Sequence, residues 1–268
     1  SDRQEKQLTG WSDNVQTVAV HGVFDDCQRL VKAAFQDDTW QTRKRLSSAN
    51  SINIGRLLPQ MTYYAHASLQ HWREHGTRPT VVVPSGNLGN GLACLYAREC
   101  GLPIGDVILA TNENRPVTHY LDTGEWEPFD SRETLATAMD VGNPSNMERL
   151  RHHWPTVEAL REAIGAERVS DAAIERQIRR GPDEWDTVWD PHTACAVEVR
   201  ERRAADADDW MLVATAHPAK FPEVVEPLIG RTVDVPAPLA DVMARAQPVP
   251  KIDPSLAALA DIVFSPTA

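Results

Sequence analysis

Residues 81–90 read VVVPSGNLGN, an apolar run of β-branched residues followed by a turn of Ser, Gly and Asn. Three consecutive valines favour a buried strand, because β-branched side chains pack well on a pleated surface. The next stretch, GLACLYAREC at 91–100, predicts a helix that ends at Gly101. DVILAT, at 106–111, predicts a second buried strand. This order of strand, turn, helix and strand indicates an α/β fold with a parallel sheet and crossover helices.

Helices dominate the expectations for the rest of the chain. A helix should begin in FDDCQRLVKAAF, with Asp25 or Asp26 as its N-cap. A longer amphipathic helix is expected from about Ile52 to Trp72, and Pro59 should kink it or divide it in two. The remaining expectations are strands at 15–20 and 210–215, helices at 145–180 and 193–204, and a tail rich in Pro and Ala beyond Arg231.

Composition and charge set the class of protein. The chain has 268 residues, of which 42% are hydrophobic and 24% charged, as in an ordinary globular protein. Its formal net charge of −11 argues against nucleic acid as a partner, because neutralising phosphates needs a basic face. No apolar run approaches the roughly 20 residues of a membrane span, and no secretory leader is recognisable. The sequence therefore predicts a cytoplasmic protein with free thiols at Cys27, Cys94, Cys100 and Cys195.

The turn after the first buried strand has the composition of a phosphate-binding loop. Gly86 and Gly89 let the backbone turn sharply and approach a ligand, and Ser85 and Asn87 add side-chain donors. The helix that follows directs its positive end at the same place. The loop lacks the ending of a Walker motif and the GxGxxG of dinucleotide-binding loops. A plain turn that happens to contain glycine is the structural alternative.

A second candidate anion site precedes the long helix, in SSANSINIGRLLPQ at 47–60. Asn50, Ser51 and Asn53 supply polar side chains at a helix start. Arg56 follows Asn53 by three residues and so shares its face, where a guanidinium can bind a phosphate with two hydrogen bonds. An ordinary helix cap beside an exposed arginine is the structural alternative, and the stretch alone favours it.

Several short stretches identify a family when they are taken together and in order. They are QEK (4–6), GVFDDCQRLVK (22–32), NSINIGR (50–56), VPSGNLGN (83–90), ATNEN (110–114), TAMDVGNPSN (137–146), DPHTA (190–194) and TAHPAKF (215–221). With these motifs the sequence resembles the threonine synthases from Gln4 to about Leu228. Members of that family use pyridoxal 5'-phosphate to convert O-phospho-L-homoserine and water to L-threonine and phosphate.

The resemblance implies a fold and a division of the chain. The fold is that of the type II pyridoxal-phosphate enzymes, which resemble the β subunit of tryptophan synthase, here incomplete at the amino terminus. Residues 1–45 are expected to belong to the smaller, mobile half of the enzyme. Residues 46–230 are expected to form the large domain that binds cofactor and phosphate. Residues 231–268 are expected to form a surface tail.

The resemblance also assigns roles to residues. In the family the glycine loop holds the cofactor phosphate, which implies that role for Ser85, Gly86, Asn87, Leu88 and Gly89. The NSxNxxR element holds the substrate phosphate, which implies that role for Asn50, Ser51, Asn53 and Arg56. Thr215 corresponds to the residue that hydrogen-bonds the pyridine nitrogen, and a hydroxyl there leaves the nitrogen largely unprotonated.

Three other polar residues in the matched motifs are expected to be structural. His192 and Thr193 lie near the cofactor region by pattern, but a buried histidine with satisfied hydrogen bonds and a helix-capping threonine are the favoured interpretations. The same holds for His217. No metal site is expected, because the adjacent His152 and His153 lack the spacing of helical ligands.

The lysine that the family uses is missing from the sequence. Family members bind the cofactor covalently through a lysine in an F-K-D type motif, in a part of the chain that precedes this sequence. The lysines of this chain, none of them in such a motif, are Lys6, Lys32, Lys44, Lys220 and Lys251. No catalytic residue is therefore recognised, and the chain is expected to be a carboxy-terminal portion that is inactive alone. Its partners would be the missing amino-terminal half or a second copy.

Four hypotheses for the function remain. The first is a carboxy-terminal portion of threonine synthase, which the intact NSINIGR element favours. The second is a related phospholyase acting on another phosphorylated amino compound. The third is an inert module that binds a phosphate-bearing ligand without forming a covalent bond. The fourth is an unrelated α/β protein with chance matches, which the ordered set of motifs argues against.

Overall fold

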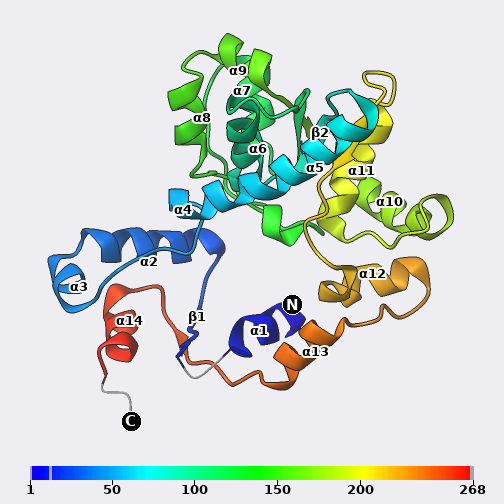
Figure 1. The fold of residues 1–268 in the computed structure, drawn as a ribbon. Helices are drawn as coiled ribbons and strands as arrows, with labels where there is room; N and C mark the ends of the chain where they lie inside the picture. Colours follow the sequence, from blue (N-terminus) through cyan, green and yellow to red (C-terminus); the bar gives the residue numbers. More distant parts are fainter. Residues whose placement is uncertain (1, 12–13, 266–268) are drawn as a thin grey trace. The chain divides into compact units, whose positions relative to one another are not determined.

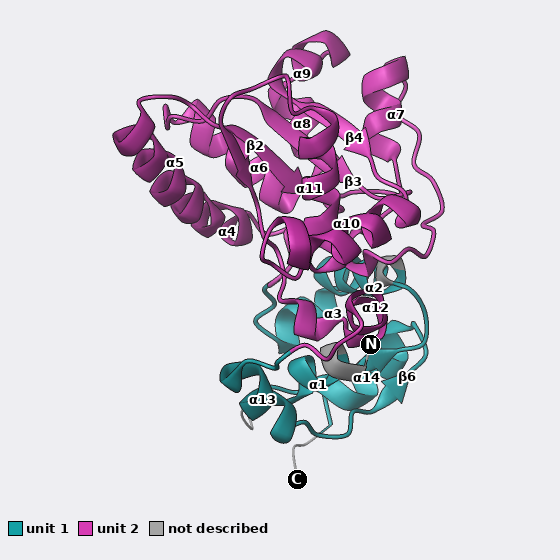
Figure 2. Cartoon of the chain, turned by 90° about the vertical axis from the view of Figure 1, so that its right-hand side faces the viewer, with its two compact units in different colours: residues 1–47, 234–268 teal, residues 48–233 magenta. Residues whose placement is uncertain are grey.

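The structure is a computed structural model that describes residues 2–11 and 14–265 (Figure 1). The chain divides into two compact units, shown in different colours in Figure 2. Unit 1 contains residues 1–47 and 234–268, and unit 2 contains residues 48–233. Within the described ranges, no helix combines the length and the apolar character that crossing a membrane would require.

Unit 2 is built on a parallel sheet of four strands in the order β4-β3-β2-β5. Val82 pairs with Ile108 on one side and with Leu212 on the other, and all neighbouring strands are parallel. The expected parallel α/β fold is confirmed. The strands are β2 (Thr80–Pro84), β3 (Val107–Thr111), β4 (Gly165–Arg168) and β5 (Trp210–Leu212).

Helices cover both faces of this sheet, because the central strands are apolar on both sides. Val81 and Val83 point into one buried cluster, whereas Val82 points into the other. The first cluster is completed by α5 (Met61–His75), α6 (Gly89–Glu99), α7 (Pro116–Thr123), α8 (Met147–His153) and α9 (Val157–Ala163). The second is completed by α10 (Asp171–Glu184), α11 (Pro191–Arg202) and α12 (Pro222–Ile229).

Pro59 divides the helix expected from Ile52 to Trp72, as the sequence predicts. A short helix, α4 (Ile54–Leu57), is followed by a 3-10 turn, η1 (Leu58–Gln60), and then by α5. Pro59 lies inside this turn, where its missing N–H is not needed. Gly76 ends α5 in the left-handed conformation.

Three expectations about elements are wrong in detail. Residues 145–180 contain β4 as well as helices, because this short, half-exposed strand is held by pairing with β3 rather than by apolar residues of its own. The predicted strands at 15–20 and 210–215 shorten to β1 (Ala19–Val20) and to β5. Neither Asp25 nor Asp26 is the N-cap of α2 (Phe24–Gln36). Val23 takes that position, and the Asp26 carboxylate accepts a hydrogen bond from its backbone N–H at 2.9 Å.

Unit 1 joins the two ends of the chain. Ala19 and Val20 pair in parallel with Lys251 and Ile252. The structure groups residues 234–268 with residues 1–47, whereas the sequence predicts a separate surface tail at residues 231–268. Besides β1 and α2, the elements of unit 1 are α1 (Asp2–Thr9), α3 (Asp38–Arg43), α13 (Ala237–Ala244), β6 (Lys251–Ile252) and α14 (Leu256–Val263).

Candidate functional site

The glycine loop leaves the carboxyl end of β2 and enters α6 with its backbone amides unused. The amides of Gly86 through Gly91 have no hydrogen-bond acceptor among the described residues, whereas Leu92 N–H already bonds Leu88 O at 2.9 Å. Leu88, at the N-cap of α6, is left-handed, with φ of 65°. Consecutive free amides around a left-handed residue form a concave donor array suited to an anion.

The glycines of this loop allow other segments to approach it closely. A Cβ on Gly89 would lie 2.9 Å from Cβ of Ser51, and one on Gly86 would lie 2.6 Å from Cα of Met139. Neither glycine has a positive φ. Their role here is therefore to bring the loop against the second candidate anion element and against the 3-10 turn η2 (Thr137–Met139).

Ser51 joins the two candidate anion elements that the sequence analysis identifies. Its hydroxyl oxygen accepts from Nδ2 of Asn87 at 2.8 Å and from Nδ2 of Asn146 at 2.9 Å, and the hydroxyl donates to Oδ1 of Asn50 at 3.2 Å. The Asn87 side chain also accepts from the backbone and hydroxyl of Ser145. The structure thus brings Asn50, Ser51 and Asn87 into one network.

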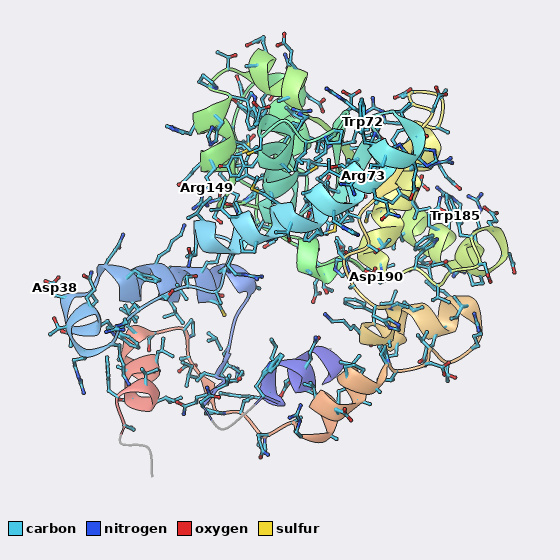
Figure 3. The ribbon with its side chains drawn as sticks, viewed as in Figure 1. Asp38, Trp72, Arg73, Arg149, Trp185 and Asp190 are labelled. Carbon is cyan, nitrogen blue, oxygen red and sulfur yellow. The ribbon has the colours of Figure 1, made fainter. Side chains whose placement is uncertain are left out.

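Asn146 and Arg149 complete this network and were not assigned a role from the sequence. Asn146 is buried and donates to Asn87 O at 2.9 Å. Arg149, labelled in Figure 3, donates to Oδ1 of Asn146 at 2.6 Å and to Ile52 O at 2.7 Å. The available signal was their spacing, because residues three apart on a helix share a face. Nothing in the sequence indicated which segment that face would meet.

Asn53 and Arg56 of the NSINIGR element differ in their contacts. Asn53 caps α4, since its Oδ1 accepts from Gly55 N at 2.9 Å, and its Nδ2 donates to Ser48 O at 2.8 Å. The exposed Arg56 guanidinium makes no hydrogen bond or ion pair among the described residues. Of the predicted substrate-phosphate residues, Arg56 is therefore the one cation available to bind an anion in the described structure.

A pocket of about 430 Å³ opens beside the glycine loop. Its walls are Tyr63, Tyr64 and Ala67 of α5, Asn90 at the start of α6, and residues 211–215 at the end of β5. The buried Tyr64 hydroxyl donates to Oδ1 of Asn90. Burial raises the pKa of Tyr63 to about 12 and also raises that of Tyr64. Both phenols are therefore neutral at physiological pH and can donate hydrogen bonds.

A buried polar cluster at the end of β3 supports the turn η2. Asn112 donates to Oδ1 of Asp140 at 2.7 Å and to Ala136 O at 3.3 Å. Thr134 donates to the same carboxylate oxygen at 2.7 Å. Burial raises the pKa of Asp140, against the hydrogen bonds from Thr134 and Asn112 that lower it. This cluster fixes the position of the turn against which Gly86 packs.

The other side of η2 is held from α11. Asp190 is the N-cap of this helix, and Oδ1 accepts from Nδ1 of His192 at 2.9 Å. Nε2 of His192 accepts from Ala138 N at 3.1 Å. Thr193 donates to Oδ2 of Asp190, and its oxygen accepts from Thr215 N at 3.3 Å. His192 is thus the satisfied structural histidine that the sequence predicts, whereas the helix cap is Asp190 and not Thr193.

His217 and the lysines lie outside the pocket lining. Nδ1 of His217 accepts from Ala219 N at 3.1 Å and caps the turn η3 (Pro218–Lys220). Lys220 is the single lysine in the sequence of unit 2, and it does not line the pocket. Within the described residues of unit 2, no amine reaches the pocket wall.

Comparison with known proteins finds that this chain is similar to threonine synthases. The family model for threonine synthase, C-terminal, matches residues 193–263. The chain is 40% identical to threonine synthase of Escherichia coli K12 over 247 residues, which cover 90% of this chain and 56% of that protein. It is 34% identical to threonine synthase of Saccharomyces cerevisiae, covering 83% of this chain and 52% of that protein.

Solved structures agree with the sequence comparisons. The crystal structure of threonine synthase from Escherichia coli superposes with a TM-score of 0.87 at 37% identity, covering 98% of this chain and 61% of that chain. The PLP-bound threonine synthase from Brucella melitensis superposes with a TM-score of 0.87 at 31% identity, covering 98% and 62%. The chain spans about half the length of the curated relatives it matches.

Proposed function

This chain belongs to the threonine synthase family and has the fold of type II pyridoxal-phosphate enzymes, and we propose that it supplies the phosphate-binding part of such an enzyme. The enzyme is a lyase of threonine biosynthesis that converts O-phospho-L-homoserine and water to L-threonine and phosphate. One observation carries the proposal: the free amides of the glycine loop lie beside the NSINIGR element, joined to it through Ser51. Two phosphate-binding elements in contact suit an enzyme whose cofactor and substrate both carry a phosphate.

The glycine loop fits the phosphate of pyridoxal 5'-phosphate. The consecutive amides of Gly86 through Gly91 lack acceptors, and a phosphate oxygen would satisfy them. Asn87 would contribute its backbone amide, because its side chain is engaged with Ser51 and Ser145. Ser85 would act differently. Its own amide bonds Ala110 O and its hydroxyl donates to Val83 O at 3.2 Å, so Ser85 would reach the phosphate only after its hydroxyl turns away from Val83.

The pocket fits the ring of the same cofactor. When bound, pyridoxal phosphate supplies an electron-withdrawing ring that stabilises negative charge beside the α-carbon of an amino acid. Thr215 lines the pocket, and its hydroxyl would bond the pyridine nitrogen. A neutral hydroxyl leaves that nitrogen largely unprotonated. Tyr63 and Asn90 line the same pocket.

The substrate phosphate would be held by the NSINIGR element. Arg56 offers a guanidinium with no competing partner in the described structure, and it can bind phosphate through two parallel hydrogen bonds. Asn50 would supply a neutral donor through Nδ2, Ser51 would position Asn50 by donating to its Oδ1, and Asn53 orients the first turn of α4 as its cap. The predicted roles of these four residues stay proposals for this chain.

The amine that forms the covalent bond to the cofactor is proposed to come from outside unit 2. The residues that line the pocket include no lysine, which supports the expectation that this chain is inactive alone. We propose the amino-terminal half of the enzyme as the partner, with a homodimer as the alternative, and the cytoplasm as the location. Residues 1–45 are proposed to complete the smaller half of the enzyme, and unit 2 to be the large domain.

The test is complementation. This chain is mixed with the amino-terminal portion of a threonine synthase and pyridoxal phosphate, and phosphate release from O-phosphohomoserine is followed. We expect release from the mixture and not from this chain alone. Borohydride reduction and intact mass should label the added portion. A stoichiometric label on a lysine of this chain, or a mixture without phosphate release, would contradict the proposal.

Arg56 provides a variant for the same assay. Arg56→Gln should raise KM for O-phosphohomoserine about 10- to 100-fold, because a charge-assisted phosphate contact is lost. Arg73→Gln is the matched control, since Arg73 is an exposed arginine of α5 (Figure 3). It should leave KM unchanged. Equal effects of the two substitutions would show that the effect is one of general charge rather than of a phosphate site.

A further inference from the structure

We propose that Asp190 is a positioning residue that fixes both ends of the cofactor pocket, the glycine loop and Thr215, through one buried carboxylate. This inference rests on the proposed function, because that function makes these two ends the sites of the cofactor phosphate and of its ring nitrogen. Asp190 is 1% exposed and does not line the pocket. It acts through two arms, one from each carboxylate oxygen.

The first arm runs from Oδ1 to the glycine loop. Oδ1 accepts from the backbone N–H of His192 and from its Nδ1, both at 2.9 Å. Nε2 of His192 accepts from Ala138 N at 3.1 Å, so Nε2 carries no proton and the imidazole is the Nδ1–H tautomer. Ala138 belongs to the turn η2, which Gly86 approaches so closely that a Cβ would clash at 2.6 Å. The imidazole orientation therefore sets where the loop packs.

The second arm runs from Oδ2 to Thr215. Thr193 donates its hydroxyl hydrogen to Oδ2, which directs a lone pair of its oxygen at Thr215 N, 3.3 Å away. Thr215 follows β5 in a segment without regular secondary structure and lines the pocket. Its backbone is therefore held by a side chain and not by a strand partner. The Thr193 hydroxyl sets the position of the Thr215 side chain through that backbone.

A carboxylate at a helix start is suited to this double role. Both of its oxygens only accept hydrogen bonds, so each can serve an arm whose first atom donates. The N-terminus of α11 favours a negative charge there. The helix itself is buried and packs against β2, β3 and β5, so Asp190 is anchored to the sheet that carries the pocket. A shift of Asp190 would be transmitted to both ends at once.

The test measures backbone amide hydrogen exchange by NMR, without ligand, at Ala138 and Thr215. Asp190→Ser retains a capping hydroxyl for α11 but is too short to serve both arms. It should accelerate exchange about tenfold at both amides. Thr193→Val should accelerate Thr215 alone and His192→Leu should accelerate Ala138 alone. Thr193→Ser, which keeps the hydroxyl, should restore the wild-type rate at Thr215.

Amides of β2 and β3 are the internal reference, because a general loss of stability would accelerate them as well. The inference would be overturned if Asp190→Ser accelerated amide exchange at only one of Ala138 and Thr215. It would also be overturned if exchange in β2 and β3 accelerated equally. Pyridoxal phosphate titration of the same variants separates this inference from the proposed function. If Asp190→Ser accelerates exchange at both Ala138 and Thr215 but the wild-type chain does not bind pyridoxal phosphate, the proposed function alone is overturned. Normal cofactor affinity in Asp190→Ser, with the wild type binding, overturns the role of Asp190 in positioning.

Discussion

Ser51 shows how one hydroxyl can hold two segments of a site together. It accepts hydrogen bonds from the amides of Asn87 and Asn146, which come from the glycine loop and from the segment before α8. These donors are partly or fully buried, so water does not readily replace the oxygen. A buried donor without an acceptor costs more than the bond itself contributes. This oxygen therefore contributes to holding the loop in its conformation.

Ser51→Ala should destabilise the chain by about 1–3 kcal/mol, since it leaves two amide donors without their acceptor. Urea denaturation followed by circular dichroism measures this difference. Thr62→Ala is the control, because the Thr62 hydroxyl bonds Pro59 O on the exposed side of α5. That variant should differ from wild type by less than about 0.5 kcal/mol. Equal losses in the two variants would remove the special role of Ser51.

The residue types of the glycine loop predicted that a turn occurs there, but not which of its residues is left-handed. The glycines of VPSGNLGN indicated a tight turn, yet the left-handed residue is Leu88, and Gly86 and Gly89 have no positive φ. A left-handed leucine costs about 1–2 kcal/mol, and burial of its side chain in the core offsets that cost. Contacts with Ser51 and Met139 explain the glycines, and those contacts are between segments far apart in the sequence.

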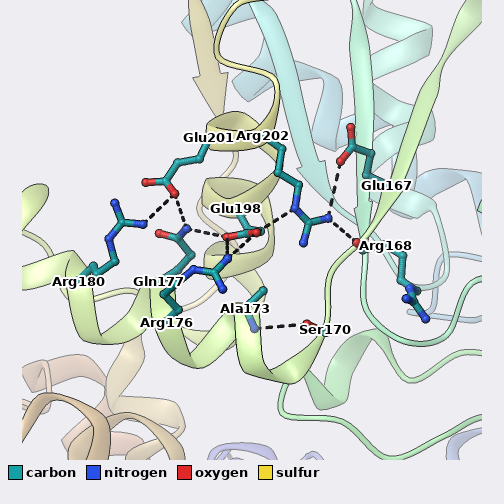
Figure 4. Close-up of polar contacts among 10 residues, drawn as sticks. All are labelled: Glu167, Arg168, Ser170, Ala173, Arg176, Gln177, Arg180, Glu198, Glu201 and Arg202. Carbon is teal, nitrogen blue, oxygen red and sulfur yellow. Dashed lines mark hydrogen bonds and ion pairs between the residues drawn. The ribbon is translucent and has the colours of Figure 1, made fainter.

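At the scale of elements, α10 and α11 are joined by a network of ion pairs around one buried carboxylate (Figure 4). Glu198 accepts from Arg176 and Gln177 of α10, each at 2.7 Å, and from Arg202 at 2.8 Å. Burial alone would raise the pKa of Glu198, but these hydrogen bonds outweigh it and hold the pKa below its ordinary value of 4.5. The charged form is therefore stabilised by folding, and this stabilisation holds α10 against α11.

Glu198→Gln should lower the free energy of unfolding by about 1–3 kcal/mol at pH 7. A carboxylate with a lowered pKa contributes stability above its ordinary pKa and loses it as pH falls through the folded value. The difference between wild type and variant should therefore shrink from pH 6 to pH 3. Glu184→Gln, which removes an exposed partner of Arg180, should change stability by less than about 0.5 kcal/mol. A pH-independent difference for Glu198→Gln would contradict this account.

Helices and strands were predicted correctly where the local sequence alone determines the conformation. The valines of β2 and the proline of η1 were sufficient, because burial on both faces and a missing N–H act locally. β4 was missed, since GAER has no apolar alternation and owes its conformation to the register with β3. The position of Asn146 beside Ser51 was equally invisible. It depends on how two loops pack and not on either sequence.

At the scale of the whole molecule, unit 1 is closed by contacts between the two ends of the chain. The ring centroid of Phe264, just beyond α14, lies 4.7 Å from that of Trp40 in α3. The Arg43 guanidinium lies 3.9 Å from the centroid of the Phe264 ring. Trp40 is buried. Sequence composition suggested a surface tail here, because Pro and Ala say little about the partner that a segment will find.

Phe264→Ala should destabilise unit 1 by about 1–2 kcal/mol, through lost burial and a lost aromatic pair. Amide hydrogen exchange should accelerate in α2 and α3 and remain unchanged in β2 and β3 of unit 2. Phe129→Ala is the control, because Phe129 is an exposed phenylalanine of unit 2. Acceleration of exchange in the sheet of unit 2 would show that the two units do not respond separately.

The amides of Gly86 through Gly91 are proposed to bind the phosphate of pyridoxal 5'-phosphate. NMR titration of these amides tests it directly, with pyridoxal phosphate, inorganic phosphate and phosphate-free pyridoxal as three probes. Arg56→Gln is titrated in parallel to separate the neighbouring substrate-phosphate element. We expect saturable shifts of these amides with both phosphate-bearing probes, in wild type and in Arg56→Gln, and none with pyridoxal. Amides that do not respond to phosphate, or that respond equally to pyridoxal, would contradict it.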